Sequence, residues 1–479
     1  MKRNIQLLVL ISVLFLLEGC ATNPVTGKKE FMLLSKEQEI QMGKSSHPEI
    51  LSYFGVYEDP ELQQYIEEKG QAMAEISHRP ELEYTFTIVD SPVINAFAVP
   101  GGYVYFTRGI MAHFNNTAEF AGVLGHEIGH ITARHSAKQY SRSLAAQAGV
   151  IAGSIAFEGF SQYADMTLQG LSILFLKFGR DAERESDKLG VEYSTDIGYD
   201  AHEMAEFFNT LDRAGESSGT PVPGFLSTHP DPGERREKVH QMAEQAQKKN
   251  ESAYAVERDN YLDLIDGLMY GENPRNGFFE DGYFYHPEMK FYFPIPPGWN
   301  TQNMPTQVVL APEDGTAFMQ FTLAQEDNID AALNNIVNNN QLQVVDQGMI
   351  KNNSDLKIKM VRFVLEQEQQ QLAGELYGIE YLSDNYLMVG LTSADDFNRY
   401  AEVFNQVAGG FNRLTDTEKL NRQPDVISIK TVQNSGPLQD QLAAFGVESE
   451  KFEEHAVLNG MTLDENLSRG DRIKVIARQ

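Results

Sequence analysis

The spacing of apolar residues divides the chain into a helical part, a strand-rich part and a short mixed tail. Across residues 51–250 the apolar positions mostly recur every three or four residues, which predicts helices such as 61–76. Two short alternating segments, 83–89 and 102–106, predict strands joined by a turn at residues 95–102. The first part is therefore expected to be a mainly α domain with a small β-hairpin or sheet.

The pattern becomes strand-like after a polar stretch, and residues 251–275 are expected to form a linker. Residues 276–418 contain several alternating segments and two helical ones, 329–337 and 397–411. This order predicts an α+β sandwich in which one layer of helices covers an antiparallel sheet. The segment weakly resembles the PsbP-like sandwich. It offers no group of His, Cys or acidic residues suited to catalysis, so we interpret it as an accessory domain.

Residues 425–479 read as strand, helix, helix and strand. With the stretches LNG and RGDRIKV they resemble a LysM-like peptidoglycan-binding repeat. Two interpretations stay open for this C-terminal module. One is contact with peptidoglycan, and the other is a structural cap.

The N-terminus has the pattern of an export signal. Two basic residues precede a nearly unbroken apolar run of about 13 residues, shorter than the roughly 20 that span a membrane, so we expect a signal peptide over 1–19. Cys20 follows this run and resembles a bacterial lipobox cysteine, although Glu18 departs from the usual small or apolar residue. The resemblance implies lipidation of Cys20, and Ala21 then implies an outer-membrane lipoprotein facing the periplasm. Residues 20–50 are expected to be the tether and the first helix.

Composition and length exclude one class of partner and one kind of cross-link, and indicate the number of domains. The formal net charge of -29 argues against nucleic acid, whose phosphates are bound by clustered Lys and Arg. Cys20 is the only cysteine, so a disulfide within the chain is excluded. The length of 479 residues suffices for about three domains.

The stretch HEIGH, His126 to His130, carries the candidate chemistry. On a helix, side chains four residues apart lie within about 40° of each other, so both imidazoles can hold one metal ion. Glu127 then lies beside the metal, where a carboxylate can accept a proton from water. Asn116 or Thr117 is expected to cap this helix. The pattern predicts a zinc hydrolase that holds one Zn²⁺ per subunit.

The third ligand must come from another segment. A metzincin would place Gly and His where this chain has Ala133 and Ser136, so that class is excluded. His135 lies about 140° around the helix from His130, so we expect it to support the site rather than bind the same ion. Downstream, Glu183 and Glu185 are both candidates, and helical periodicity does not choose between them.

The motifs taken together resemble a known family. HEIGH, the upstream NAFAVPGGYVYFTRG and the downstream RDAERESDKLG are similar to the zinc metallopeptidases that include the CAAX prenyl protease type one and HtpX, in particular their exported lipoprotein branch. This resemblance implies that Glu183 is the third zinc ligand and that Asp187 orients a ligand histidine or donates a proton. It also implies a function for His229 of Thr228-His229-Pro230, as oxyanion stabiliser or fourth metal ligand.

The resulting expectation is a zincin-like (gluzincin) peptidase domain followed by the α+β sandwich and the LysM-like module. The resemblance implies a metalloendopeptidase of envelope proteins, with Glu127 as general base and protein or peptide substrates. The alternative is an envelope chaperone or assembly lipoprotein whose zinc site is self-blocked. A prenyl-protein protease is disfavoured because those enzymes span the membrane several times. Glu119 is expected either to contact a ligand imidazole or to cap the helix start.

Overall fold

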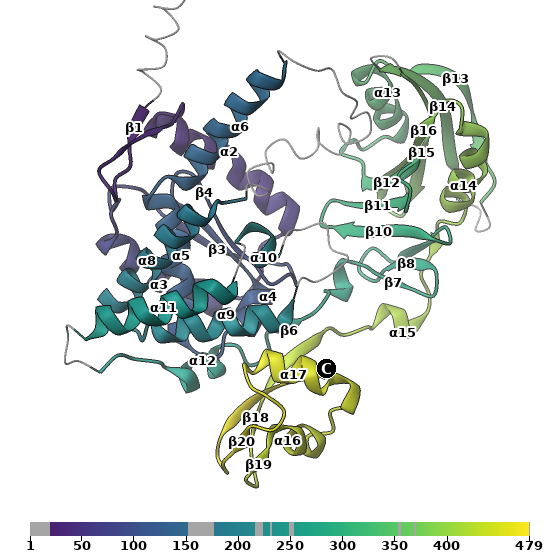
Figure 1. Ribbon diagram of the computed structural model, residues 1–479. Coiled ribbons are helices and arrows are strands. Elements are labelled where there is room, and N and C mark those ends of the chain that lie inside the picture. The colour runs from purple at the N-terminus through teal and green to yellow at the C-terminus, as the bar shows by residue number, and fades with distance from the viewer. Residues whose placement is uncertain are drawn as a thin grey trace, which may run out of the picture. The chain divides into compact units, whose positions relative to one another are not determined.

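Two compact units make up the chain in a computed structural model (Figure 1). The first combines the described residues up to 271 with residues 425–478, and the second comprises described residues of 272–424. The predicted signal peptide, 1–19, lies outside the described residues, and no described helix is both long and apolar enough to cross a membrane. The structure describes residues 20–151, 177–215, 224–229, 232–248, 253–352, 356–367 and 370–478.

The first unit is mainly helical, as predicted. It begins with a hairpin of β1 and β2, which we call the N-terminal hairpin (residues 20–31). Its helices are α2 (Lys36–Phe54), α3 (Pro60–Ile76), α4 (Arg108–His113), α5 (Thr117–Thr132), α6 (His135–Ile151), α8 (Arg180–Asp196), α9 (His202–Ala214), α10 (Phe225–Thr228), α11 (Pro232–Gln247) and α12 (Arg258–Leu264). The hairpin strands are β1 (Cys20–Thr22) and β2 (Lys29–Phe31). Helix α2 crosses the expected boundary at residue 50.

The small sheet of this unit differs from the predicted hairpin. Strand β3 (Thr85–Val89) pairs in parallel with β5 (Tyr103–Thr107), and β4 (Ala96–Val99) pairs antiparallel with β5. The predicted turn at residues 95–102 was therefore wrong, because it contains a strand. All four residues of β4 are buried, so the strand lacks the apolar and polar alternation by which a half-buried strand is recognised.

Close packing of helix α8 on helix α5 positions the site (Figure 1). A Cβ atom on Gly190 would lie only 2.9 Å from the carbonyl oxygen of Gly122 and 3.2 Å from the amide nitrogen of His126. A Cβ on Gly125 would lie 3.0 Å from the Cα of Gly190. The glycines thus let the two backbones approach more closely than larger residues allow, which brings the acidic start of α8 to the His residues of α5.

Residues 253–271, most of the expected linker 251–275, instead contribute to the first unit. They contain α12 and strand β6 (Met269–Tyr270), and Tyr261 and Leu262 of α12 are completely buried. The polar run that suggested a linker occupies only the start of this segment. Burial of the apolar residues that follow it explains why the chain does not separate here.

The C-terminal module also belongs to the first unit rather than forming a unit of its own. Its Ile427 and Leu458 are part of the same core cluster as helix α5. The buried ammonium of Lys474 donates to the carbonyl oxygens of Ala112, at 2.8 Å, and Phe114, at 2.9 Å. Its elements are β18 (Asp425–Thr431), β19 (Gly436–Pro437), α16 (Leu438–Ala444), η3 (Ser449–Lys451), α17 (Phe452–Leu458), β20 (Asn466–Leu467) and β21 (Arg472–Arg478). The strand, helix, helix and strand order is present, and the LysM-like assignment stays a prediction.

The second unit contains the strand-rich sequence. Its described strands form a seven-stranded antiparallel sheet, in the order β10-β11-β12-β16-β15-β14-β13, and a four-stranded sheet, in the order β17-β9-β8-β7. The strands are β7 (Phe278–Glu280), β8 (Tyr283–His286), β9 (Phe291–Pro294), β10 (Trp299–Met304), β11 (Gln307–Pro312), β12 (Ala317–Leu323), β13 (Gln343–Ile350), β14 (Ile358–Gln367), β15 (Gln370–Tyr381), β16 (Asp384–Ser393) and β17 (Asn412–Arg413). The helical elements are η2 (Pro274–Asn276), α13 (Ile329–Asn339), α14 (Phe397–Gly409) and α15 (Thr417–Leu420).

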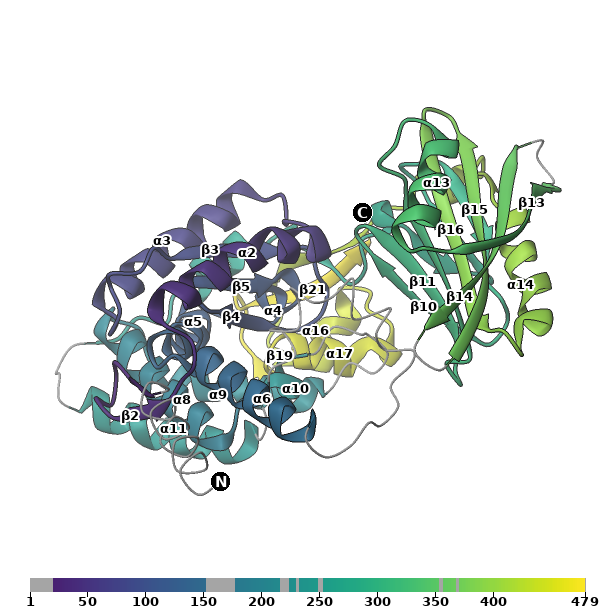
Figure 2. The same ribbon diagram turned by 90° about the horizontal axis from the view of Figure 1, so that it is seen from above.

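The helices of the second unit do not form the single layer that the sequence predicts. Helix α13 packs with Leu376 of β15, whereas α14 packs with the next residue, Tyr377 (Figure 2). Neighbouring residues of a strand point to opposite faces of a sheet, so the two helices cover opposite faces. The central strand β16 is therefore largely buried, whereas the edge strand β13 is exposed along nearly its whole length.

Candidate metal centre

Helix α5 presents HEIGH within the core. The Asn116 side chain caps the helix by accepting a hydrogen bond from the amide of Glu119 at 2.8 Å, in agreement with one of the two expected caps. Every residue of α5 is buried. The Nε2 atoms of His126 and His130 lie 3.0 Å apart, as the four-residue spacing predicts.

Glu183, in the first turn of α8, faces the two histidines. Its carboxylate oxygens lie 3.7 Å from His126 Nε2 and 3.5 Å from His130 Nε2. Glu185 points elsewhere and lies 3.1 Å from His135 Nε2. The structure therefore brings Glu183, and not Glu185, to the histidine pair, a choice that periodicity had left open.

His229 joins the same group from the end of α10. Its Nδ1 lies 3.3 Å from His126 Nε2 and 3.1 Å from a carboxylate oxygen of Glu183. One ligand atom from each of the four residues can be chosen so that all lie within 4.8 Å of one another, and all four residues are buried. Two nitrogen ligands of a tetrahedral zinc are about 3.3–3.5 Å apart, so the four residues fit this ion. Burial lowers the pKa of His130 well below its usual value, which favours the neutral imidazole that binds metal.

Glu127 lies beside this cluster without a hydrogen-bond partner among the described residues for either carboxylate oxygen. One of these oxygens is 3.7 Å from His229 Nε2. Burial raises the pKa of Glu127, which makes its carboxylate a stronger base. A base that activates water must be able to accept a proton from that water. The buried Glu127 carboxylate can do so, because no described residue donates a hydrogen bond to it and it lies beside the four possible metal ligands.

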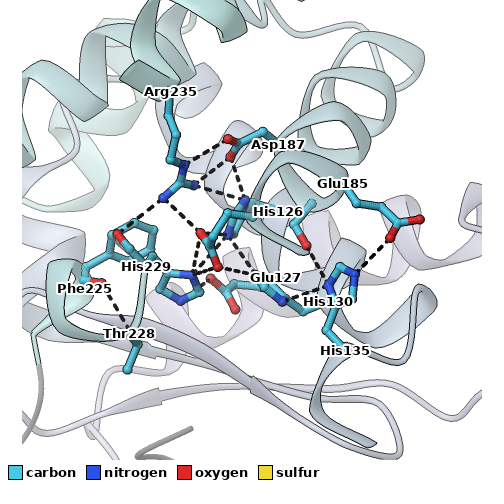
Figure 3. A network of polar contacts seen from close by, with 12 residues as sticks. His126, Glu127, His130, His135, Glu185, Asp187, Phe225, Thr228, His229 and Arg235 are labelled. Carbon is cyan, nitrogen blue, oxygen red and sulfur yellow. Dashed lines mark hydrogen bonds and ion pairs between the residues drawn. The ribbon is translucent and has the colours of Figure 1, made fainter. Parts of the chain in front are cut away.

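Asp187, one turn after Glu183, contacts the other side of His126. Its Oδ1 lies 3.0 Å from His126 Nδ1, and Arg235 donates to both of its oxygens (Figure 3). Burial by itself would raise the pKa of Asp187, but the guanidinium of Arg235 outweighs it and lowers the pKa to about 2. A carboxylate in this position holds the imidazole with Nε2 free to bind a metal.

Arg235 is the site residue that the sequence analysis missed. It extends from α11, is buried, and places Nη1 3.0 Å from Glu183 Oε2 and 3.4 Å from the carbonyl oxygen of His229. Its guanidinium also lies over the Phe208 ring. The only sequence feature that could have pointed to Arg235 is its position six residues after His229, near the start of a helix. Several charged residues lie near that helix start, so the sequence does not show which of them is buried.

His135 lies beside the metal cluster and is not one of its four residues. Its Nδ1 lies 3.1 Å from His130 Nδ1, and its Nε2 faces Glu185. Glu119 lies at the helix start, where Oε2 accepts a hydrogen bond from the Asn115 amide at 2.6 Å. The capping role proposed for Glu119 therefore agrees with the structure, and the contact with a ligand imidazole does not.

Comparison with known proteins finds a family match for this region. Residues 60–243 match Peptidase family M48. The chain is 30% identical over 251 residues to the beta-barrel assembly-enhancing protease of Escherichia coli (strain K12), covering 50% of this chain and 51% of that protein. It is 30% identical over 184 residues to the mitochondrial metalloendopeptidase OMA1 of Arabidopsis thaliana, covering 38% of this chain and 36% of that protein. The chain thus spans about half, or less, of the length of these relatives.

A solved structure also aligns with part of the chain. Cyanobacterial PsbP from Synechocystis is 10% identical, covers 27% of this chain and 91% of its own, and gives a TM-score of 0.23. The family match and the buried cluster agree on the first unit: residues 60–243 match Peptidase family M48, and the same residues hold a buried group of His and Glu side chains that can bind a metal ion, as in a zinc metallopeptidase of the M48 type.

Proposed function

We propose that this protein is a zinc-dependent metalloendopeptidase that hydrolyses peptide bonds in misfolded or unassembled cell-envelope proteins. The observation that carries the proposal is the buried group of His126, His130, Glu183 and His229 beside the unpartnered carboxylate of Glu127. The substrate class is supported by the name of the Escherichia coli relative, a beta-barrel assembly-enhancing protease.

In this proposal His126, His130 and Glu183 hold one zinc ion as a gluzincin-type ligand set. When bound, zinc supplies the Lewis acidity that activates water and polarises a peptide carbonyl. The carboxylate of Glu127 accepts the proton of the attacking water and then passes it to the nitrogen of the leaving amine. Asp187 and Arg235 hold His126 in the orientation and tautomer that binding requires.

His229 adds a regulatory element to the proposal. A catalytic zinc site keeps one position open, yet His229 Nδ1 lies at the distances from His126 and Glu183 expected of a fourth ligand. We propose a self-blocked resting state in which His229 would be the fourth residue to hold a bound zinc ion, and in which its side chain would have to move for substrate to enter. The ring of Phe225, stacked on His229 at 4.4 Å between centroids, helps to hold the blocked position.

The test of the proposed chemistry is Glu127→Gln, which keeps the size of the side chain and removes its basicity. We expect zinc content equal to that of the wild type and loss of chelator-sensitive cleavage of unfolded casein. Full cleavage by this variant would reject Glu127 as the base. If wild-type protein binds zinc but cleaves no unfolded protein, the alternative of a chaperone with a latent zinc site is favoured.

The role of His229 is tested by His229→Ala, with His202→Ala on α9 as the control. If His229 blocks the metal, the variant keeps zinc through the three remaining ligands and cleaves casein faster than wild type. If His229 instead stabilises the oxyanion, cleavage falls while zinc is retained. A parallel effect in the control would point to a general loss of structure.

We further propose that the protein is an outer-membrane lipoprotein anchored through Cys20, on the basis of the apolar run and cysteine at the N-terminus. Cys20→Ser is expected to abolish incorporation of labelled palmitate and to release the protein from the membrane fraction. For the C-terminal module we propose the structural role, because Lys474 is buried against α4 and the segment shares the core of the first unit. Co-sedimentation with purified peptidoglycan tests the other interpretation.

A further inference from the structure

We propose that His135 and Glu185 are positioning residues for the metal ligand His130, and that Asn23 of the N-terminal hairpin completes this relay. The inference rests on the proposed zinc site and extends it to a segment that was expected to be a simple tether. The hairpin begins at Cys20, so the relay joins the start of the described chain to the metal centre.

The first step is the second nitrogen of His130. Its Nε2 faces the metal cluster, so Nδ1 carries the proton and needs an acceptor. His135 Nδ1 lies 3.1 Å from this nitrogen. His135 accepts this proton only as the tautomer protonated on Nε2, and Nε2 lies 3.1 Å from Glu185 Oε2. One arrangement of protons therefore satisfies His130, His135 and Glu185 together (Figure 3).

The two ligand histidines of α5 are thus supported differently. Asp187 contacts His126 directly, at 3.0 Å. Glu185 reaches His130 only through the imidazole of His135, which is buried and is also 3.2 Å from the Ser186 hydroxyl. His130 therefore contacts a carboxylate indirectly, through His135, whereas His126 contacts the carboxylate of Asp187 directly.

The outer end of the relay is held by Asn23, which is completely buried. Its Nδ2 donates to Glu185 Oε1 at 3.5 Å. Its Oδ1 accepts from the amides of Val25, at 2.9 Å, and Thr26, at 3.2 Å, so its orientation is fixed by its own turn. Asn23 therefore presents a donor to Glu185 in a defined direction.

Two further contacts hold the hairpin region against helix α6, which begins with His135. Lys138 forms an ion pair of 2.8 Å with Glu30, and the amide of Leu33 donates to Ser141 Oγ at 2.9 Å. With the Asn23 contact to α8, these fasten the segment to both helices that carry the relay. A free tether would make none of these contacts.

The relay is tested by zinc affinity, measured by competition with a chromogenic chelator. Glu185→Ala and His135→Ala are expected to raise the zinc Kd about 10- to 100-fold, the usual effect of losing a partner of a ligand histidine. Glu185→Gln keeps an acceptor for His135 and should recover most of the affinity. Glu192→Ala, seven residues later on α8, is the matched control and should bind zinc as wild type does.

Asn23→Asp tests the outer end without disturbing the turn. It keeps the oxygen that accepts from Val25 and Thr26, but replaces the donor to Glu185 with a carboxylate oxygen. We expect the zinc Kd to rise about three- to tenfold, the contribution of one hydrogen bond. The visible spectrum of the Co²⁺-loaded protein should change in Glu185→Ala and His135→Ala, because it reports the geometry of the ligands.

Wild-type zinc affinity and an unchanged Co²⁺ spectrum in Glu185→Ala and His135→Ala would overturn the relay, and so would equal losses in Glu185→Ala and Glu185→Gln. Wild-type affinity in Asn23→Asp would remove the hairpin from it. These measurements do not depend on cleavage. A protein that binds zinc but cleaves nothing contradicts only the proposed function, whereas an active protein insensitive to Glu185→Ala contradicts only the relay.

Discussion

Arg235 donates two hydrogen bonds to Asp187, from Nε to Oδ2 at 2.9 Å and from Nη2 to Oδ1 at 2.6 Å. Both side chains are buried, and Asp187 Oδ1 also contacts His126 Nδ1 at 3.0 Å. The guanidinium thus keeps ionised the carboxylate that orients a proposed zinc ligand. Two residues 48 positions apart in the chain thereby stabilise one imidazole.

Arg235→Met should therefore weaken both the fold and the metal site. Removing one partner of a buried pair leaves an uncompensated charge and costs about 3–5 kcal/mol of unfolding free energy. We also expect zinc affinity to fall about 10- to 100-fold, because Asp187 becomes protonated or moves. Zinc titration and thermal unfolding measure the two effects. Arg236→Met, at the neighbour that is half-exposed and pairs with Glu206 away from the site, should change neither. An unaffected Arg235→Met would remove Arg235 from the site.

Gly190→Ala is expected to separate helices α5 and α8. The new Cβ would lie 2.9 Å from the Gly122 carbonyl oxygen, a backbone atom that cannot rotate away. Overpacking of this kind costs about 1–3 kcal/mol and should also move Glu183 from the histidines, with loss of zinc. Gly233→Ala on α11 makes the same change in open space and should be neutral or slightly stabilising. Equal unfolding midpoints and zinc contents for the two variants would refute the close-packing argument.

Lys474→Met tests whether the C-terminal module is part of the peptidase unit. The change shortens the side chain by one atom, the nitrogen, and leaves the Ala112 and Phe114 carbonyl oxygens without their donor, at a cost of about 1–3 kcal/mol for each group left unpaired. Urea unfolding should shift to lower concentrations. Lys430→Met on the neighbouring strand β18 is the control. A destabilisation no larger than that of the control would favour a module that only rests on the peptidase unit.

His113 should make the first unit less stable in acid. Burial lowers the pKa of its imidazole from 6.5 to about 4, so the unfolded chain binds a proton at pH values where folded His113 stays neutral. Its contribution to stability is complete above about pH 6.5 and is lost as the pH falls towards 4, by about 3 kcal/mol in total. His113→Asn keeps a donor near the Gly109 carbonyl oxygen and should flatten the pH dependence of the unfolding free energy over this window. An unchanged slope in the variant would assign the acid sensitivity to other groups.

The spacing of residues along one helix was enough to predict part of the site. His126, Glu127 and His130 lie within one turn of α5, so their relative positions follow from helical geometry wherever the helix is placed. The helices 61–76 and 180–195 were predictable for the same reason, as was the strand-rich character of residues 276–418. Strand β4 was not, because a strand with every residue buried has no alternating pattern.

By itself, the sequence determined that a helix carries two histidines and a carboxylate on the spacing of a zinc site, and that strands dominate the second unit. Helical periodicity left Glu183 and Glu185 open and only the family resemblance favoured Glu183, and the tertiary structure places Glu183 against the histidines. The tertiary structure alone decided that Arg235 is buried against Asp187 and that the C-terminal module shares the core of the first unit. The physical reason is the distance along the chain over which a sequence pattern relates two residues. A helical period relates residues within about two turns, whereas these contacts depend on how closely α5 and α8 approach, which Gly190 and its glycine neighbours on α5 permit.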